Sequence, residues 1–114
     1  MAILAFVAPI LPGKRSQWDG FMEEISGPRR ADFNASRERY GVHERTFLQE
    51  TPMGDFVIVT LEGDNPMASF GALAAADDEF TNWFVQQVQE IHGFDLRTPP
   101  DNPPRQVIDS QTTS

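Results

Sequence analysis

The segment Gly54–Gly63, which reads Gly-Asp-Phe-Val-Ile-Val-Thr-Leu-Glu-Gly, decides the fold of this chain. Its middle, Phe56–Leu61, contains almost no polar residue, and a glycine closes each end of the segment. A strand with one face in water alternates apolar and polar residues, so this run predicts a strand that is buried on both faces. A chain of 114 residues has little material with which to cover both faces of a sheet. We therefore expect a second copy of the protein to cover one of them.

Three further segments have the pattern of strands. Ala2–Ile10 is apolar at both odd and even positions, and it predicts a second strand buried on both faces. Val42–Glu50 alternates imperfectly and is more polar, which is typical of a sheet edge. Thr51-Pro52-Met53-Gly54 is a turn signal that joins it to the central strand as a hairpin. Gln106–Asp109 is the candidate for a short last strand around two apolar residues.

Between the strands, apolar residues recur at helical spacing. Four helical segments are expected, which begin after an N-cap at Ser16, at about Pro28, at Pro66 after a cap at Asp64 or Asn65, and after an N-cap at Asp77. The last of them, to about His92, has the clearest apolar stripe, and Gly93 is expected to end it.

The order strand, helix, strand, strand, helix, strand predicts an α+β fold of the ferredoxin-like βαββαβ type with an antiparallel sheet. In that topology the first and third strands lie in the centre and the second and fourth at the edges, which matches the apolar and polar strands of this chain. We expect one domain over residues 1–114, of which about 97–114 form an extended, proline-rich tail. The helices would cover one face of the sheet and leave the other for a partner.

The composition narrows the possible partners. The net charge is −8, and binding to nucleic acid needs a basic surface, so we expect no nucleic acid partner. No cysteine is present, which excludes disulfides and thiolate chemistry. No apolar run approaches the roughly 18 residues of a membrane span, so we expect no membrane partner and a cytoplasmic location. We also expect no metal and no cofactor, because no motif for either appears in the sequence.

The hairpin Gln49–Asp55 and the later Asn82-Trp83-Phe84 resemble those of small bacterial members of the dimeric α/β-barrel superfamily. The resemblance runs from Ala2 to about Leu96. It implies a homodimer whose two sheets pack face to face, with a ligand site between sheet and helices. The superfamily includes antibiotic-biosynthesis monooxygenases, haem-degrading monooxygenases, muconolactone isomerases and members with no known activity.

The candidate site residues lie around the polar strand. His43 and Arg45 are the predicted catalytic residues, because imidazole moves protons near neutral pH and a guanidinium holds a carboxylate or enolate. Tyr40, Gln49 and Trp83 are the predicted ligand-binding residues. The alternative interpretation is that the polar residues only protect an exposed sheet edge from aggregation.

His92 is the second histidine, and its position suggests a different role. At the end of the last helix, a cationic histidine would favour the negative end of the helix dipole. Haem-degrading members of the superfamily use an asparagine, a tryptophan and a helical histidine, and Asn82, Trp83 and His92 are present here. Their asparagine lies on the first strand, however, where this chain has only apolar residues.

Two functions are consistent with these features of the sequence. The first is the binding of a small molecule in a cleft between sheet and helices. The alternative is a cofactor-free monooxygenase or isomerase that acts on a small aromatic or enolisable substrate. The sequence leaves open whether the protein is an enzyme.

Overall fold

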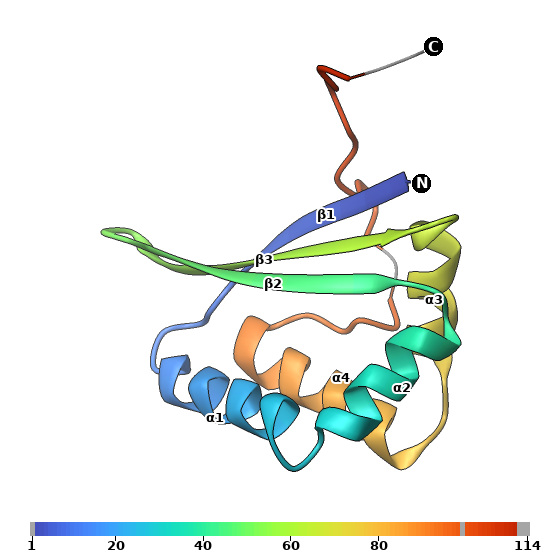
Figure 1. Ribbon diagram of the computed structural model, residues 1–114. Helices are drawn as coiled ribbons and strands as arrows, with labels where there is room; N and C mark the ends of the chain where they lie inside the picture. The colour runs from blue at the N-terminus through green and yellow to red at the C-terminus, as the bar shows by residue number, and fades with distance from the viewer. Residues whose placement is uncertain (1, 99, 112–114) are drawn as a thin grey trace.

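A three-stranded antiparallel sheet forms one layer of the molecule (Figure 1). The computed structural model describes residues 2–98 and 100–111. The strands are β1 (Ala2–Pro9), β2 (His43–Thr51) and β3 (Gly54–Gly63), in the order β1-β3-β2. The strand predicted to be buried on both faces, β3, is therefore the central one, as expected.

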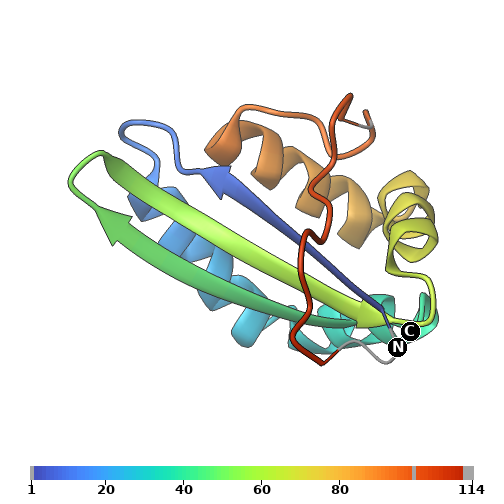
Figure 2. The same ribbon diagram turned by 90° about the horizontal axis from the view of Figure 1, so that it is seen from above.

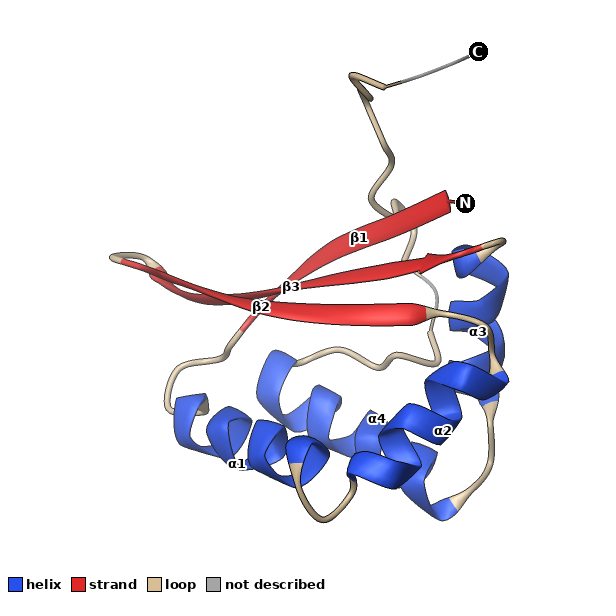
Figure 3. Cartoon of the chain, viewed as in Figure 1, coloured by secondary structure: helices blue, strands red, loops and turns tan. Residues whose placement is uncertain are grey.

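Four helices form the second layer, and all lie on one side of the sheet (Figures 1 and 3). They are α1 (Arg15–Ser26), α2 (Arg30–Arg39), α3 (Pro66–Ala75) and α4 (Glu79–His92). The mixed α+β class and the antiparallel sheet are thus confirmed. No helix in residues 2–98 or 100–111 is long and apolar enough to cross a membrane.

Side chains at the helix ends explain where α3 and α4 begin and stop. Asn65 caps α3, as predicted, by accepting a hydrogen bond from the backbone N–H of Ala68. The cap of α4 is Asp78 rather than the predicted Asp77, and its Oδ1 accepts from the N–H of Thr81 at 2.8 Å. Gly93 ends α4 at φ 80°, a left-handed conformation that favours glycine. The prediction of Ser16 as an N-cap was wrong, because α1 already includes that residue.

The core lies between the sheet and the helices. Within each strand, alternate side chains face the helices, and the strand register places them in rows across the sheet. Val57 and Leu61 of β3 are buried on this inner face, and Ala8 of β1 is buried beside Val57. Opposite them, Phe21 of α1 and Ile91 of α4 belong to the main hydrophobic cluster.

The outer face of the sheet is not covered by any helix of the described chain. Ile3, Val7 and Phe47 point to this side and remain 54%, 61% and 51% exposed. Ile58 of β3 lies between Val7 and Phe47 in one cross-strand row. Along the same face, a second row consists of Ile3, Glu62 and His43. The outer face therefore has a mainly apolar end around Ile58 and a polar end, at which Ile3 is the apolar exception.

The predicted fourth strand is absent from the part of the chain that the structure describes. Gln106–Asp109 pairs with no strand, so β1 is an edge strand rather than a central one, and the full βαββαβ pattern is not formed. Val107 and Ile108 are 84% and 87% exposed. Two apolar residues in a polar, proline-rich segment bury too little surface to fix a strand on their own. The tail passes to the outer side of the sheet and runs across it when seen from above (Figure 2). Pro99, part of the predicted stiff segment, lies outside the described residues.

Candidate functional site

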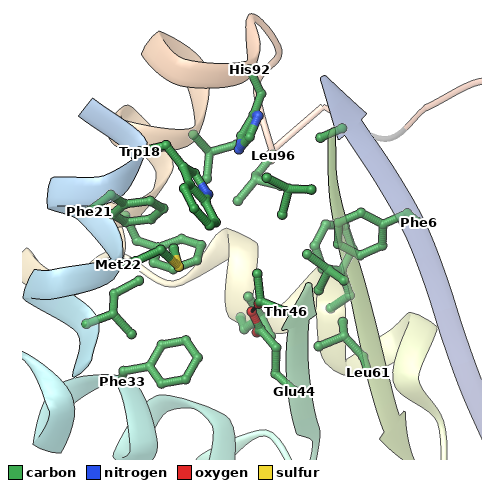
Figure 4. Close-up of a pocket in the computed structure, with 18 of the residues that line it drawn as sticks. Phe6, Trp18, Phe21, Met22, Phe33, Glu44, Thr46, Leu61, His92 and Leu96 are labelled. Carbon is green, nitrogen blue, oxygen red and sulfur yellow. Dashed lines mark hydrogen bonds between the residues drawn. The ribbon is translucent and has the colours of Figure 1, made fainter. Parts of the chain in front are cut away.

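A pocket of about 80 Å³ lies between the inner face of the sheet and the helices (Figure 4). All three strands and all four helices contribute side chains to it. Its walls are mainly aromatic and aliphatic, with contributions from Phe6, Trp18, Phe21, Met22, Phe33, Leu61, Phe84 and Leu96. The chain's clearest candidate for a ligand site is this pocket, because a concave apolar space with a few polar groups is the usual form of one.

Aromatic packing holds the helix side of the pocket in place. The ring of Phe21 contacts the rings of Trp83 and Phe84, with centroids 5.4 and 5.1 Å apart. Phe33 of α2 stacks on Phe84 at 6.4 Å. Such pairs stabilise a fixed geometry beyond their burial. Three helices are therefore joined by one aromatic cluster, which forms a rigid wall.

An ion pair between Arg37 and Glu44 is the main polar feature of the wall. Arg37 Nε donates to Glu44 Oε1 at 2.8 Å, and the side chains are only 8% and 9% exposed. The guanidinium of Arg37 also lies 4.5 Å from the ring centroid of Phe33 and 4.7 Å from that of Phe84. A second hydrogen bond, from Thr46 Oγ1 to Glu44 Oε2, is long at 3.5 Å. The pair joins α2 to the edge strand β2 and places a cation and an anion beside the pocket.

His92 is the fourth polar residue in the wall. It is buried at the end of α4, and its ring points into the pocket beside Trp18 (Figure 4). Nδ1 lies 2.7 Å from the carbonyl oxygen of Pro9. A carbonyl oxygen only accepts hydrogen bonds, so Nδ1 carries the proton and donates it. Together with the bond from Leu11 N–H to Ile91 O at 2.9 Å, this contact fastens the end of α4 to the end of β1.

Burial lowers the pKa of His92 below its ordinary value of 6.5, although the hydrogen bond to Pro9 opposes the shift. The ring is therefore neutral at pH 7, with its proton on Nδ1 and a lone pair on Nε2. This corrects the expectation of a cationic histidine that favours the helix dipole.

The structure does not bring the five predicted site residues together. His43, Arg45 and Gln49 are exposed and lie on the outer face of β2, on the side away from the helices and the pocket. Arg45 Nη1 donates to Glu62 Oε1 at 3.3 Å on that face. Their predicted place in a cleft between sheet and helices was therefore wrong, because the parity of β2 is opposite to the one assumed.

The other two predicted ligand-binding residues lie on the helix side. Tyr40 is half-buried and packs against the small cluster of Val42, Leu61 and Leu73. Trp83 of α4 packs on Phe21, and the guanidinium of Arg29 lies 4.2 Å from its ring centroid. Neither residue lines the pocket in the part of the chain that the structure describes.

Four polar residues of the pocket wall were not predicted as parts of a site, namely Arg37, Glu44, Thr46 and His92. The signal for Glu44 and Thr46 was present, since they share a face of the predicted strand Val42–Glu50 with its two aliphatic residues, Val42 and Leu48. Arg37 follows Phe33 by four residues, so both lie on one face of α2. Nothing in the sequence indicated that the ring of His92 reaches Pro9, because that contact spans 83 residues.

Comparison with protein-family models finds no match for the chain, and comparison with curated proteins finds none either. Among the described residues, no group of three histidine and carboxylate side chains is arranged to hold a metal ion. The pocket itself is therefore the feature of the chain that bears on its function.

Proposed function

We propose that the protein binds a small, mainly apolar molecule with one polar group in the pocket between the sheet and the helices. The observation that carries this proposal is the pocket of about 80 Å³ with Arg37, Glu44 and His92 in an otherwise apolar wall. An apolar wall supplies affinity, and a few placed polar groups fix the orientation of a ligand.

The volume limits the size of the ligand. A pocket of about 80 Å³ is a few times the roughly 30 Å³ that one water takes up in the liquid, so it has room for a small molecule only. A single ring, aromatic or alicyclic, with one oxygen substituent fits that limit. Thr46 lines the pocket from the edge strand and is also exposed to solvent, so the edge of β2 is the expected point of entry.

Thr46→Phe tests the proposal, because a larger ring at the entry blocks the pocket without disturbing a buried position. Asn34→Phe is the control, since it adds the same ring to an exposed position of α2. We would screen benzoate, phenol, cyclohexanone and similar single-ring compounds by protein-detected NMR. Shifts at pocket residues in the wild type and Asn34→Phe, but at least tenfold weaker binding by Thr46→Phe, are expected. If no compound shifts pocket residues, or if Thr46→Phe binds equally well, the proposal is wrong.

We further propose that the chain is a member of the dimeric α/β-barrel superfamily and that a second copy covers the outer face of its sheet. The strand order β1-β3-β2 supports this, since it is the ferredoxin-like order without the fourth strand. The exposed apolar side chains of Ile3, Val7 and Phe47 support it as well. A face that contacts its own copy across a two-fold axis is self-complementary. Arg45 and Glu62 place a basic and an acidic side chain side by side at the polar end, so a two-fold axis there would bring each of them near its opposite on the second copy.

The tail has a part in this dimer. Three strands spaced about 4.8 Å apart, with 8 to 10 residues each, cover roughly 400 Å² per subunit in plan. A stable interface buries about 800 Å² of accessible surface per partner, a measure that is larger than the area in plan because it follows the side chains. Residues 100–111 add about 40 Å of extended chain on the outer side of the sheet. We propose that this tail, with Val107 and Ile108, packs on the second copy and adds to the buried area.

A further inference from the structure

We propose that His92 is a general base, and that its Nε2 accepts a proton from a carbon next to a carbonyl group of the bound molecule. This inference rests on the proposed ligand site, and it narrows the ligand to the enolisable ketones and related carbonyl compounds.

The geometry of the ring is the main support. The carbonyl oxygen of Pro9 fixes the proton on Nδ1, so the lone pair is on Nε2. No described residue hydrogen-bonds to Nε2, whereas every buried side-chain nitrogen and oxygen in the described chain has a partner. Nε2 is therefore not sealed in protein, and the ring to which it belongs lines the pocket and points into it beside Trp18 (Figure 4). A histidine that served only to fasten α4 would need Nδ1 alone.

Two properties of the surroundings suit this role. Burial lowers the pKa of His92, so the ring is already the free base at neutral pH, which is the form that takes a proton. The contact with Pro9 holds both the tautomer and the direction of the ring, as a fixed acceptor orients a catalytic imidazole in other proteins. The remaining charged side chains of the wall, Arg37 and Glu44, are paired with each other.

The proposed step needs no other reagent. A C–H bond next to the carbonyl carbon breaks, and its proton goes to Nε2. The electron pair of that bond forms a carbon–carbon double bond, and the π pair of the carbonyl group moves to oxygen to give an enolate. The imidazolium then returns a proton to the ligand. Return to the same carbon exchanges hydrogen with solvent, and return to a different carbon of a conjugated ligand moves its double bond. Arg37 lines the same pocket, so its guanidinium, although paired with Glu44, is the cation of the wall that faces a bound enolate.

The test uses cyclohexanone in D₂O, where loss of the proton NMR signal next to the carbonyl measures the step. His92→Asn is the informative variant, because the asparagine amide keeps a donor for Pro9 O but has no counterpart of Nε2. His43→Asn is the matched control at the exposed histidine. The wild type and His43→Asn are expected to accelerate exchange over buffer, and His92→Asn to lose this acceleration by about 100-fold or more. The wild-type rate should also fall as His92 is protonated.

The outcomes separate the two proposals. Binding of cyclohexanone at the pocket without accelerated exchange overturns the role of His92 and leaves the ligand site standing. Exchange that persists in His92→Asn also overturns it. If other single-ring compounds bind at the pocket and cyclohexanone does not, this inference is overturned and the ligand site stands. If no compound of the screen binds there, both are overturned. If His92→Asn does not fold, two measurements on the wild type take its place. The proposal is contradicted if the ¹⁵N chemical shifts of the His92 ring show the proton on Nε2. It is also contradicted if the rate of hydrogen exchange does not follow the titration of His92.

Discussion

The two faces of one sheet differ in what covers them, although the central strand is almost equally apolar on both. On the inner face, Val57 is buried beneath the helices and is 3% exposed. Its neighbour Ile58 points to the outer face, in a row with Val7 and Phe47, which remain more than half exposed. The sequence pattern of β3 therefore describes a strand that is buried on both sides, but a single subunit buries only one of them.

The faces also differ in where they hold their polar residues. The inner face buries an ion pair, Arg37 with Glu44, beside a pocket. The outer face has His43, Arg45 and Glu62 together at one end, beside Ile3, and mainly aliphatic and aromatic residues towards the other. Enclosed polar groups are typical of ligand sites, whereas an apolar area with a polar border is typical of protein interfaces.

Val57→Lys and Ile58→Lys give the sharpest test of this comparison, and the largest effects. Val57→Lys places a charge in the core, which costs several kcal/mol, while a domain has only about 5–15 kcal/mol of stability. We expect this variant to be unfolded by circular dichroism. Ile58→Lys places its charge on the outer face, where it is expected to leave a folded subunit but to separate the dimer.

Analytical ultracentrifugation of the wild type and Ile58→Lys measures the second effect. A wild-type protein that sediments as a monomer at micromolar concentration would contradict the proposed dimer. If Ile58→Lys unfolded as completely as Val57→Lys, the distinction between the faces would be wrong.

Glu44→Gln is the next test, and it acts on the inner face. The change leaves the buried guanidinium of Arg37 without its anion at nearly constant volume. Loss of one partner from a buried pair costs about 3–5 kcal/mol. The matched control, Glu62→Gln, removes the partner of Arg45 in a partly exposed pair, which contributes about 0–1 kcal/mol. Urea denaturation measures the free energy of unfolding of both variants. Equal losses would show that the buried pair of Arg37 and Glu44 stabilises the fold no more than the partly exposed pair of Arg45 and Glu62.

The sequence predicted the architecture well where the pattern was local. Phe56–Leu61 indicated the central strand, Asn65 the start of α3 and Gly93 the end of α4, because each depends on neighbours within a few residues. The fourth strand was predicted from two apolar residues, Val107 and Ile108, and the fold of a single subunit does not bury them.

The site was less predictable for two physical reasons. Neighbouring residues of a strand point to opposite faces of the sheet. The prediction that His43 faces the cleft therefore also placed Glu44 on the outer face, and both assignments were reversed. The hydrogen bond of His92 to Pro9 joins positions 83 residues apart, and the burial that makes the ring neutral comes from the assembled core. The position of His92 at the end of a helix, taken alone, suggested a cationic ring rather than the neutral one.

The smallest expected effect is the pH dependence that His92 gives to stability. Its pKa is about 6.5 in the unfolded chain and lower in the folded protein because of burial. Between these two values the unfolded state binds more protons, so the free energy of unfolding decreases as the pH falls below about 6.5. The loss is at most about 1.4 kcal/mol for each pH unit, and above pH 6.5 it disappears.

Urea denaturation at pH 7.5 and pH 5.5 measures this effect, and His92→Asn is the control that lacks the titrating group. The pKa of Asp78 is lowered in the fold mainly by its hydrogen bond to the Thr81 N–H, and that of Glu79 mainly by its hydrogen bond to Arg29. The stability that these two carboxylates contribute is lost only as the pH falls from their ordinary pKa values downward, and those values lie below pH 5.5. The wild type is therefore expected to lose more stability than His92→Asn between the two pH values. An equal loss in both proteins would mean that the ring is not kept neutral by burial, and the inner face would then lack the free base on which the proposed chemistry depends.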